Sequence, residues 1–117
     1  AALGSIDAKA PLGGVPFLLK DDGVQLEGPV PTNGSRFFAS RVATRSNTVV
    51  QRYQAAGLNI FGKTTSPEFG QLPSTVSTLW GTTRNPWNLE YSPGGSSGGA
   101  AAAVAAGIVA FGVAQRG

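Results

Sequence analysis

Short apolar runs separated by turn signals predict the secondary structure of this chain. Residues 15–19 are uniformly apolar and end at Lys20-Asp21-Asp22-Gly23, which is typical of a buried strand that ends in a turn. Ser46 can cap a helix that extends to Ala56, and Gly57 can terminate it. We also expect a short strand, an Ala-rich helix and a last buried strand, over residues 58–61, 100–106 and 108–113.

The order of these elements predicts the fold class. Strands alternate with helices, and the strands are apolar on both faces, which favours an α/β fold with a largely buried sheet. In the first helix, Val49, Tyr53 and Ala56 are expected on one face. Residues 63–95 form a long stretch interrupted by four prolines, which predicts a loop with a functional or packing role.

Composition suggests that the chain is one piece of a larger globule. Its 117 residues are enough for one domain and too few for two. Charged residues make up 13%, against about 25% in an average soluble domain. So few charges would cover the surface of a self-sufficient domain poorly, so we interpret residues 1–117 as a fragment of a single domain.

The residues that are missing exclude several classes of function. The chain has no Cys and no His, which excludes disulfides, a thiol nucleophile, a Cys/His zinc site and a Ser-His-Asp triad within these residues. The net charge of +3 is scattered, so no nucleic-acid partner is expected. The apolar residues 100–114 are too few for a membrane span. Residues 1–9 show no signal-peptide pattern, which, with the lack of Cys, favours a cytoplasmic location.

The glycine-serine loop of residues 94–99 is the most specific feature of the sequence. Glycines let a backbone approach a ligand closely, and free N–H groups at a helix start favour an anion. A flexible linker is the alternative, but such linkers do not usually lead into an Ala/Val helix. The loop also matches the G-x-S-x-G elbow, which fails here because no His is present.

A serine can also be activated by a neutral lysine. Lys20 is the candidate because it directly follows the apolar run of residues 15–19. The alternative is a solvated lysine at a strand end, paired with Asp21 or Asp22. Residues 57–64 offer a different chemistry, since Gly57 to Thr64 satisfies the P-loop pattern G-x-x-x-x-G-K-[ST]. That pattern requires a strand before Gly57 and a flexible loop after it, whereas the sequence predicts a helix and then a strand.

Four blocks of sequence together resemble the amidase signature family. They occur in the family's order and extend over nearly the whole chain from Pro11, as residues 11–21, 56–70, 81–87 and 93–99. The resemblance implies a mixed sheet wrapped by helices and hydrolysis of small-molecule carboxylic amides by a Ser–cis-Ser–Lys triad. It implies no metal and no organic cofactor.

The resemblance also implies roles for individual residues. Lys20 matches the catalytic lysine, and Ser96 matches the bridging serine, which follows a cis peptide bond. Ser97 is expected beside the lysine as a hydrogen-bond partner. The supporting glycines of the loop are Gly94, Gly95, Gly98 and Gly99.

The nucleophile of the family is expected beyond this chain. In the family it lies in a second glycine-rich turn after the bridging serine, and Gln115-Arg116 stands where the family has a Thr/Ser-Asp pair. We therefore expect an N-terminal-central fragment of an amidase-type enzyme that is inactive alone. A P-loop nucleotide-binding fragment and a non-catalytic folding module are the alternatives.

Overall fold

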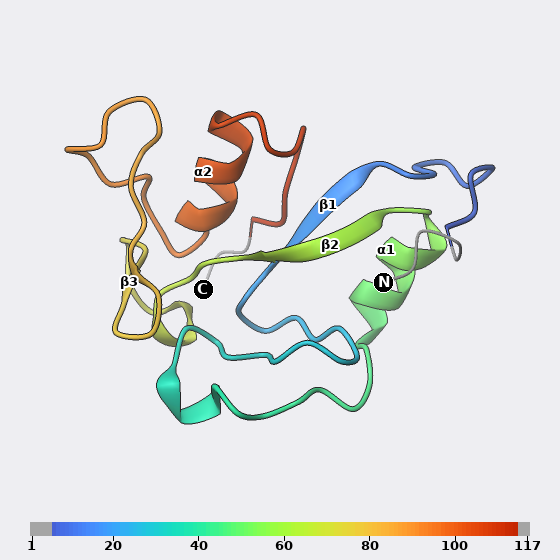
Figure 1. Ribbon diagram of the computed structural model, residues 1–117, viewed down its shortest axis with the longest axis horizontal. Helices are drawn as coiled ribbons and strands as arrows, with labels where there is room; N and C mark the ends of the chain where they lie inside the picture. The colour runs from blue at the N-terminus through green and yellow to red at the C-terminus, as the bar shows by residue number, and fades with distance from the viewer. Residues whose placement is uncertain (1–5, 115–117) are drawn as a thin grey trace.

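Two parallel strands form the centre of the molecule. The computed structural model describes residues 6–114, in which β1 (Pro16–Lys20) pairs in parallel with β2 (Asn59–Thr64) (Figure 1). The register joins Pro16 to Asn59 and Lys20 to Thr64. Both predicted strands are therefore confirmed, and the second extends beyond its predicted end at residue 61.

Helices cover the two faces of this strand pair (Figure 1). Phe17 and Leu19 pack with Val50 of α1 (Thr48–Ala55), whereas Leu18 packs with Ala103 of α2 (Gly98–Ala105). Successive side chains of a strand point to opposite faces, so a uniformly apolar strand needs cover on both sides. This arrangement confirms the α/β class and the burial of the sheet between helices.

The first helix is rotated relative to its predicted orientation. Its N-cap is Asn47 rather than Ser46, whose hydroxyl instead accepts a hydrogen bond from the Glu27 N–H at 3.0 Å. Val50 is completely buried, whereas Val49 is 38% exposed, so the predicted buried face was wrong at residue 49. The helix presents Val50 and Tyr53 to β1. The Tyr53 ring makes an edge-to-face contact with the Phe17 ring, with centroids 5.2 Å apart, and Val50 lies in the same apolar cluster.

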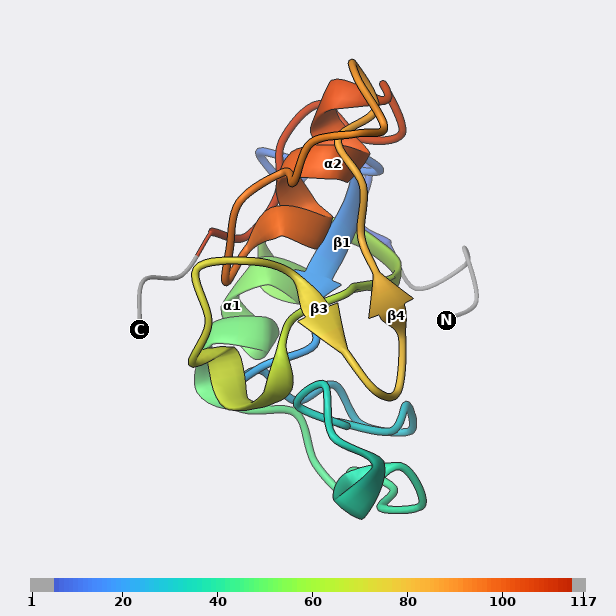
Figure 2. The same ribbon diagram turned by 90° about the vertical axis from the view of Figure 1, so that its left-hand side faces the viewer.

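The long stretch of residues 63–95 contains local structure of its own. A small antiparallel hairpin pairs β3 (Val76–Ser77) with β4 (Gly81–Thr82), and it lies in front of β1 in Figure 2. The stretch also contains a short 3-10 helix, η3 (Glu68–Gly70), and a second one, η2 (Arg36–Phe38), lies in the loop before α1. Parallel and antiparallel pairing thus occur in two separate sheets of the described chain. No helix within residues 6–114 is long and apolar enough to cross a membrane.

The predicted strand over residues 108–113 was wrong. This segment is irregular after the turn that ends α2. It is held by side chains: Val109 is buried with Leu18, and the Phe111 ring lies 5.3 Å from that of Phe17. An apolar run predicts burial, but strand formation also needs a neighbouring backbone to pair with. The residues Gln115-Arg116 lie outside the part of the chain that the structure describes.

The two adjacent valines of α1 give a matched test of this packing. Val50→Ala is expected to lower the free energy of unfolding of the complete protein by about 2 kcal/mol, because it leaves a cavity between α1 and β1. Val49→Ala should change it by a few tenths of a kcal/mol at most, because an exposed helical position mainly senses helix propensity. Denaturant unfolding of both variants checks this, and equal losses would contradict the observed helix orientation.

Candidate active site

A buried contact between a lysine and a serine brings together two distant parts of the chain. Lys20 ends β1, its side chain is 1% exposed, and its Nζ donates a hydrogen bond of 2.7 Å to the Ser96 Oγ. The same Nζ lies 3.5 Å from the Asp22 Oδ2. A solvated lysine at a strand end is therefore the wrong interpretation, although the expected pairing with Asp22 is present. An amine on a hydroxyl at this distance can exchange a proton with it.

Ser96 reaches this position from the loop that leads into α2. Its side chain is 8% exposed, and the peptide bond between Gly95 and Ser96 is cis, as the resemblance implied. Ser97 occupies the N-cap of α2. The expected contact between Ser97 and Lys20 stays a prediction.

Three of the four supporting glycines pack closely against the chain itself. A Cβ added at Gly95 would lie 2.7 Å from the Ser74 backbone N. Added at Gly98 or Gly99, it would collide with Thr75 and Thr65, respectively. No real Cβ makes such contacts, so these positions admit only glycine unless the neighbours move. The sequence pattern favours a role for these glycines in the approach of a ligand, whereas here they allow the loop to approach its own protein.

A cleft lies along the other side of the loop. It has a volume of about 620 Å³, and its lining includes Trp87, Gly94, Gly95, Ser97 and the Val104 side of α2. Gly94 has a positive φ of 83°, and a Cβ there would meet nothing within 4 Å. The loop is therefore in contact with the protein on one side and open on the other.

Thr75 contributes to the loop, although no sequence motif marks it. Its side chain is 1% exposed, and its Oγ1 donates to the Gly94 carbonyl at 2.9 Å while accepting from the Gly98 N–H at 3.0 Å. These partners lie 19 and 23 residues away in sequence. A local pattern cannot reveal such a residue, because the signal is a pairing between two loops.

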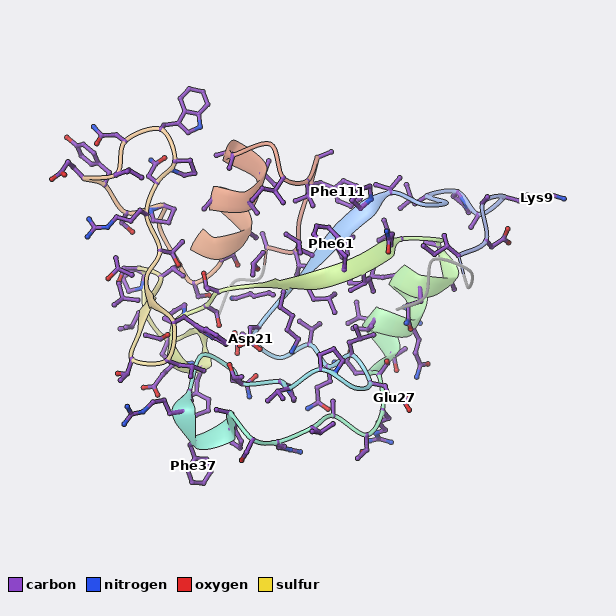
Figure 3. All side chains as sticks on the ribbon, in the orientation of Figure 1. Lys9, Asp21, Glu27, Phe37, Phe61 and Phe111 are labelled. Atoms are coloured by element: carbon purple, nitrogen blue, oxygen red, sulfur yellow. The ribbon has the colours of Figure 1, made fainter. Side chains whose placement is uncertain are left out.

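Asp21 points away from Lys20 and holds the opposite side of the strand end. It is 3% exposed, and its carboxylate accepts hydrogen bonds from both donors of Thr32, from the Lys63 Nζ at 3.3 Å and from the Trp80 Nε1 at 3.3 Å. Figure 3 shows Asp21 in the interior, where β2 ends, while Glu27 projects outward. Asp21 thus anchors the end of β1, directly beside Lys20.

The P-loop interpretation of Gly57 to Thr64 is wrong. Gly57 follows α1, and the next residues form β2 instead of a loop around a phosphate. The Lys63 Nζ is occupied by the Asp21 carboxylate and by the Val30 carbonyl at 3.0 Å. Within residues 6–114 there is also no group of three or more His, Cys, Asp or Glu side chains suited to a metal ion.

Comparison with known proteins identifies close relatives of this chain. A family model described as Amidase matches residues 2–115. A putative amidase, AmiB2, of Mycobacterium tuberculosis is 51% identical over 110 residues, covering 92% of this chain. The 6-aminohexanoate-cyclic-dimer hydrolase of Paenarthrobacter ureafaciens is 46% identical over 103 residues, covering 86% of this chain.

Solved structures share the fold described above. The crystal structure of a bacterial aryl acylamidase, an amidase signature enzyme, superposes with a TM-score of 0.79 at 40% identity, over 86% of this chain and 21% of that one. This chain likewise spans 23% of the length of AmiB2 and 21% of the length of the cyclic-dimer hydrolase. The matched region is therefore less than a quarter of each relative.

Removal of one charge tests the anchoring role of Asp21. Asp21→Asn is expected to lower the free energy of unfolding of the complete protein by about 2 kcal/mol, because Lys63 loses its charged partner in a mostly buried site. Glu27→Gln removes one negative charge from an exposed position and should have little effect. Denaturant unfolding of the two variants checks this, and similar stabilities would contradict the role of Asp21.

Proposed function

This chain belongs to the amidase family, and from that premise we propose that the complete protein hydrolyses carboxylic amides, with Lys20 and Ser96 moving the proton. The observation that carries the proposal is the buried hydrogen bond of 2.7 Å between the Lys20 Nζ and the Ser96 Oγ. A lysine side chain that is 1% exposed and aimed at a serine is poorly explained by solubility or by surface charge.

The proposed role of the pair is a two-step proton relay. The nucleophile, a serine supplied by another part of the complete protein, gives its proton to the Ser96 Oγ as it attacks the amide carbon. Ser96 passes its own proton to the Lys20 amine, which acts as the base. The proton returns by the same path to the leaving nitrogen, so that the C–N bond breaks and an amine departs. Water then releases the acyl group as a carboxylic acid.

The proposed substrate is a small-molecule amide. Among the relatives, one is named as a hydrolase of the 6-aminohexanoate cyclic dimer and another as an aryl acylamidase. These proteins differ in what they act on, while the amide bond is common to the chemistry that the family name describes. We therefore propose amide hydrolysis as the reaction of the complete protein. An assay on a panel of amides identifies the acyl and amine groups that it accepts.

Removing either member of the pair should abolish most of the activity. In the complete protein, Lys20→Ala and Ser96→Ala are each expected to lower kcat for amide hydrolysis by about 10²–10⁴-fold, because the relay loses one carrier. Lys20→Met, which keeps the buried stem and removes the amine, should fall equally. Lys9→Ala serves as the control, since Lys9 is exposed far from the site (Figure 3). Steady-state hydrolysis of simple amides checks this, and an active, folded Lys20→Met variant would refute the relay.

The 117 residues expressed alone should hydrolyse no amide. Lys20 and Ser96 match the proton carriers of the family, and neither matches its nucleophile. Large apolar side chains are also exposed in this chain, including Phe37 at 84% and Trp87 at 83%, so association or aggregation is expected. An amide assay combined with size measurement and thermal unfolding checks both points. Turnover that Ser96→Ala abolishes would instead make Ser96 the nucleophile.

A further inference from the structure

We infer that Thr75 is the positioning residue for Ser96, and that the β3–β4 hairpin exists in part to hold Thr75 in place. The inference rests on the proposed function, because it concerns the serine of the proposed relay. It starts from the two hydrogen bonds of the Thr75 hydroxyl, to the Gly94 carbonyl and from the Gly98 N–H. These partners lie two residues before and two residues after Ser96, so one hydroxyl ties both ends of the turn that presents the serine.

The fit between Thr75 and the loop leaves little freedom. Thr75 is 1% exposed, and any side chain at residue 98 would collide with its Oγ1 and lie 2.9 Å from its Cβ. Just before it, the backbone of Pro73 and Ser74 leaves no room for a side chain at Gly95. The segment of residues 73–75 therefore contacts the loop at both residues that border Ser96-Ser97. A serine held on both sides in this way cannot move toward or away from Lys20 without losing these contacts.

The hairpin fixes Thr75 in turn. The Thr75 carbonyl accepts a hydrogen bond of 3.0 Å from the Thr83 N–H, directly beyond the pairing of Val76 with Thr82. The Thr83 hydroxyl lies 2.7 Å from that of Thr65, which follows the end of β2. Contacts thus run from β2 through Thr65 and Thr83 to Thr75, and from there to the loop of Ser96.

Thr65, which follows the end of β2, also contacts the loop of Ser96 directly. Gly99 packs against the backbone and hydroxyl of Thr65, where a Cβ would lie 2.6 Å from the Thr65 N. Lys20 pairs with Thr64, the last residue of β2, and the loop of Ser96 packs on Thr65, the residue after it. The two side chains that meet at 2.7 Å are therefore held by adjacent residues at the end of β2.

This geometry distinguishes a hydroxyl role from a packing role for Thr75. Thr75→Val keeps the shape and removes both hydrogen bonds, whereas Thr75→Ser keeps the hydroxyl and removes a methyl group. In the complete protein, Thr75→Val is expected to lower kcat for amide hydrolysis about tenfold, with KM changed less than twofold, because a displaced proton carrier slows the chemical step. Thr75→Ser should keep kcat within about threefold of the parent. Thr78→Val, at an exposed position of the same hairpin, is the matched control.

Amide hydrogen exchange at Gly98 gives a readout that does not depend on activity. Its N–H donates to Thr75, so Thr75→Val is expected to raise its exchange rate about tenfold, while Thr75→Ser and Thr78→Val leave it near that of the parent. The kinetic probes are acetamide, hexanamide and benzamide, and circular dichroism checks that each variant is folded. If Thr75→Val does not fold, Thr75→Ala replaces it in the same comparison with Thr75→Ser.

Each outcome has a defined meaning. A parent protein that hydrolyses none of the amides refutes the proposed function, and exchange at Gly98 still tests the contact with Thr75. A folded Thr75→Val variant with unchanged kcat and unchanged exchange overturns the inference. Equal losses in Thr75→Ser and Thr75→Val also overturn it, because the methyl group rather than the hydroxyl would then be responsible. A rise in KM without a fall in kcat would place Thr75 in substrate binding and overturn it as well.

Discussion

The hydrogen bond between Lys20 and Ser96 is the constraint on which the rest of the structure depends. It joins residues 76 positions apart, and both are buried, so each side chain depends on polar partners within the protein. A buried amine is costly unless it is paired, and the partners of the Lys20 Nζ are the Ser96 hydroxyl and the Asp22 carboxylate. The serine loop and the turn after β1 together therefore allow the end of β1 to be buried. The packing of α2 against β1 and β2, and the close contacts of the glycines with Thr65 and Thr75, hold the serine loop in this position.

Lys20 and Asp21 are adjacent in sequence but have different surroundings. Lys20 points toward the loop before α2, whereas Asp21 points toward Thr32, Lys63 and Trp80. β1 ends at Lys20, and the Asp21 N–H still donates to the Thr64 carbonyl of β2 at 3.0 Å. The chain can thus place its proposed relay at the last residue of the strand and anchor the strand end through the next residue. The residue that anchors the strand end and the lysine of the proposed relay are thus joined by one peptide unit.

The sequence predicts the elements better than their partners. The apolar run of residues 15–19 and the Ala-rich run after Gly99 each formed the expected element, because local pattern and burial agree there. The run of residues 108–113 did not become a strand, since apolar character indicates burial and does not supply a pairing partner. Whether Val49 or Val50 is buried likewise depended on the packing of the helix, in which Val50 shares a cluster with Phe17 and Leu19, and a helical pattern over eight residues fits either valine.

The site shows the same division between local pattern and long-range contact. Lys20 and Ser96 could be predicted because a motif marks each of them, and the cis bond before Ser96 followed from the same resemblance. Thr75 could not, because its hydrogen bonds to the loop come from where the hairpin places it rather than from its neighbours in sequence. The glycines of the loop could be predicted in part. The sequence indicates that something approaches them closely, but only the structure identifies Ser74, Thr75 and Thr65 as the residues in contact. A glycine-rich motif therefore predicts a tight contact but does not identify the residues on the other side of it. Here those residues are buried hydroxyls and backbone atoms that lie far away in sequence.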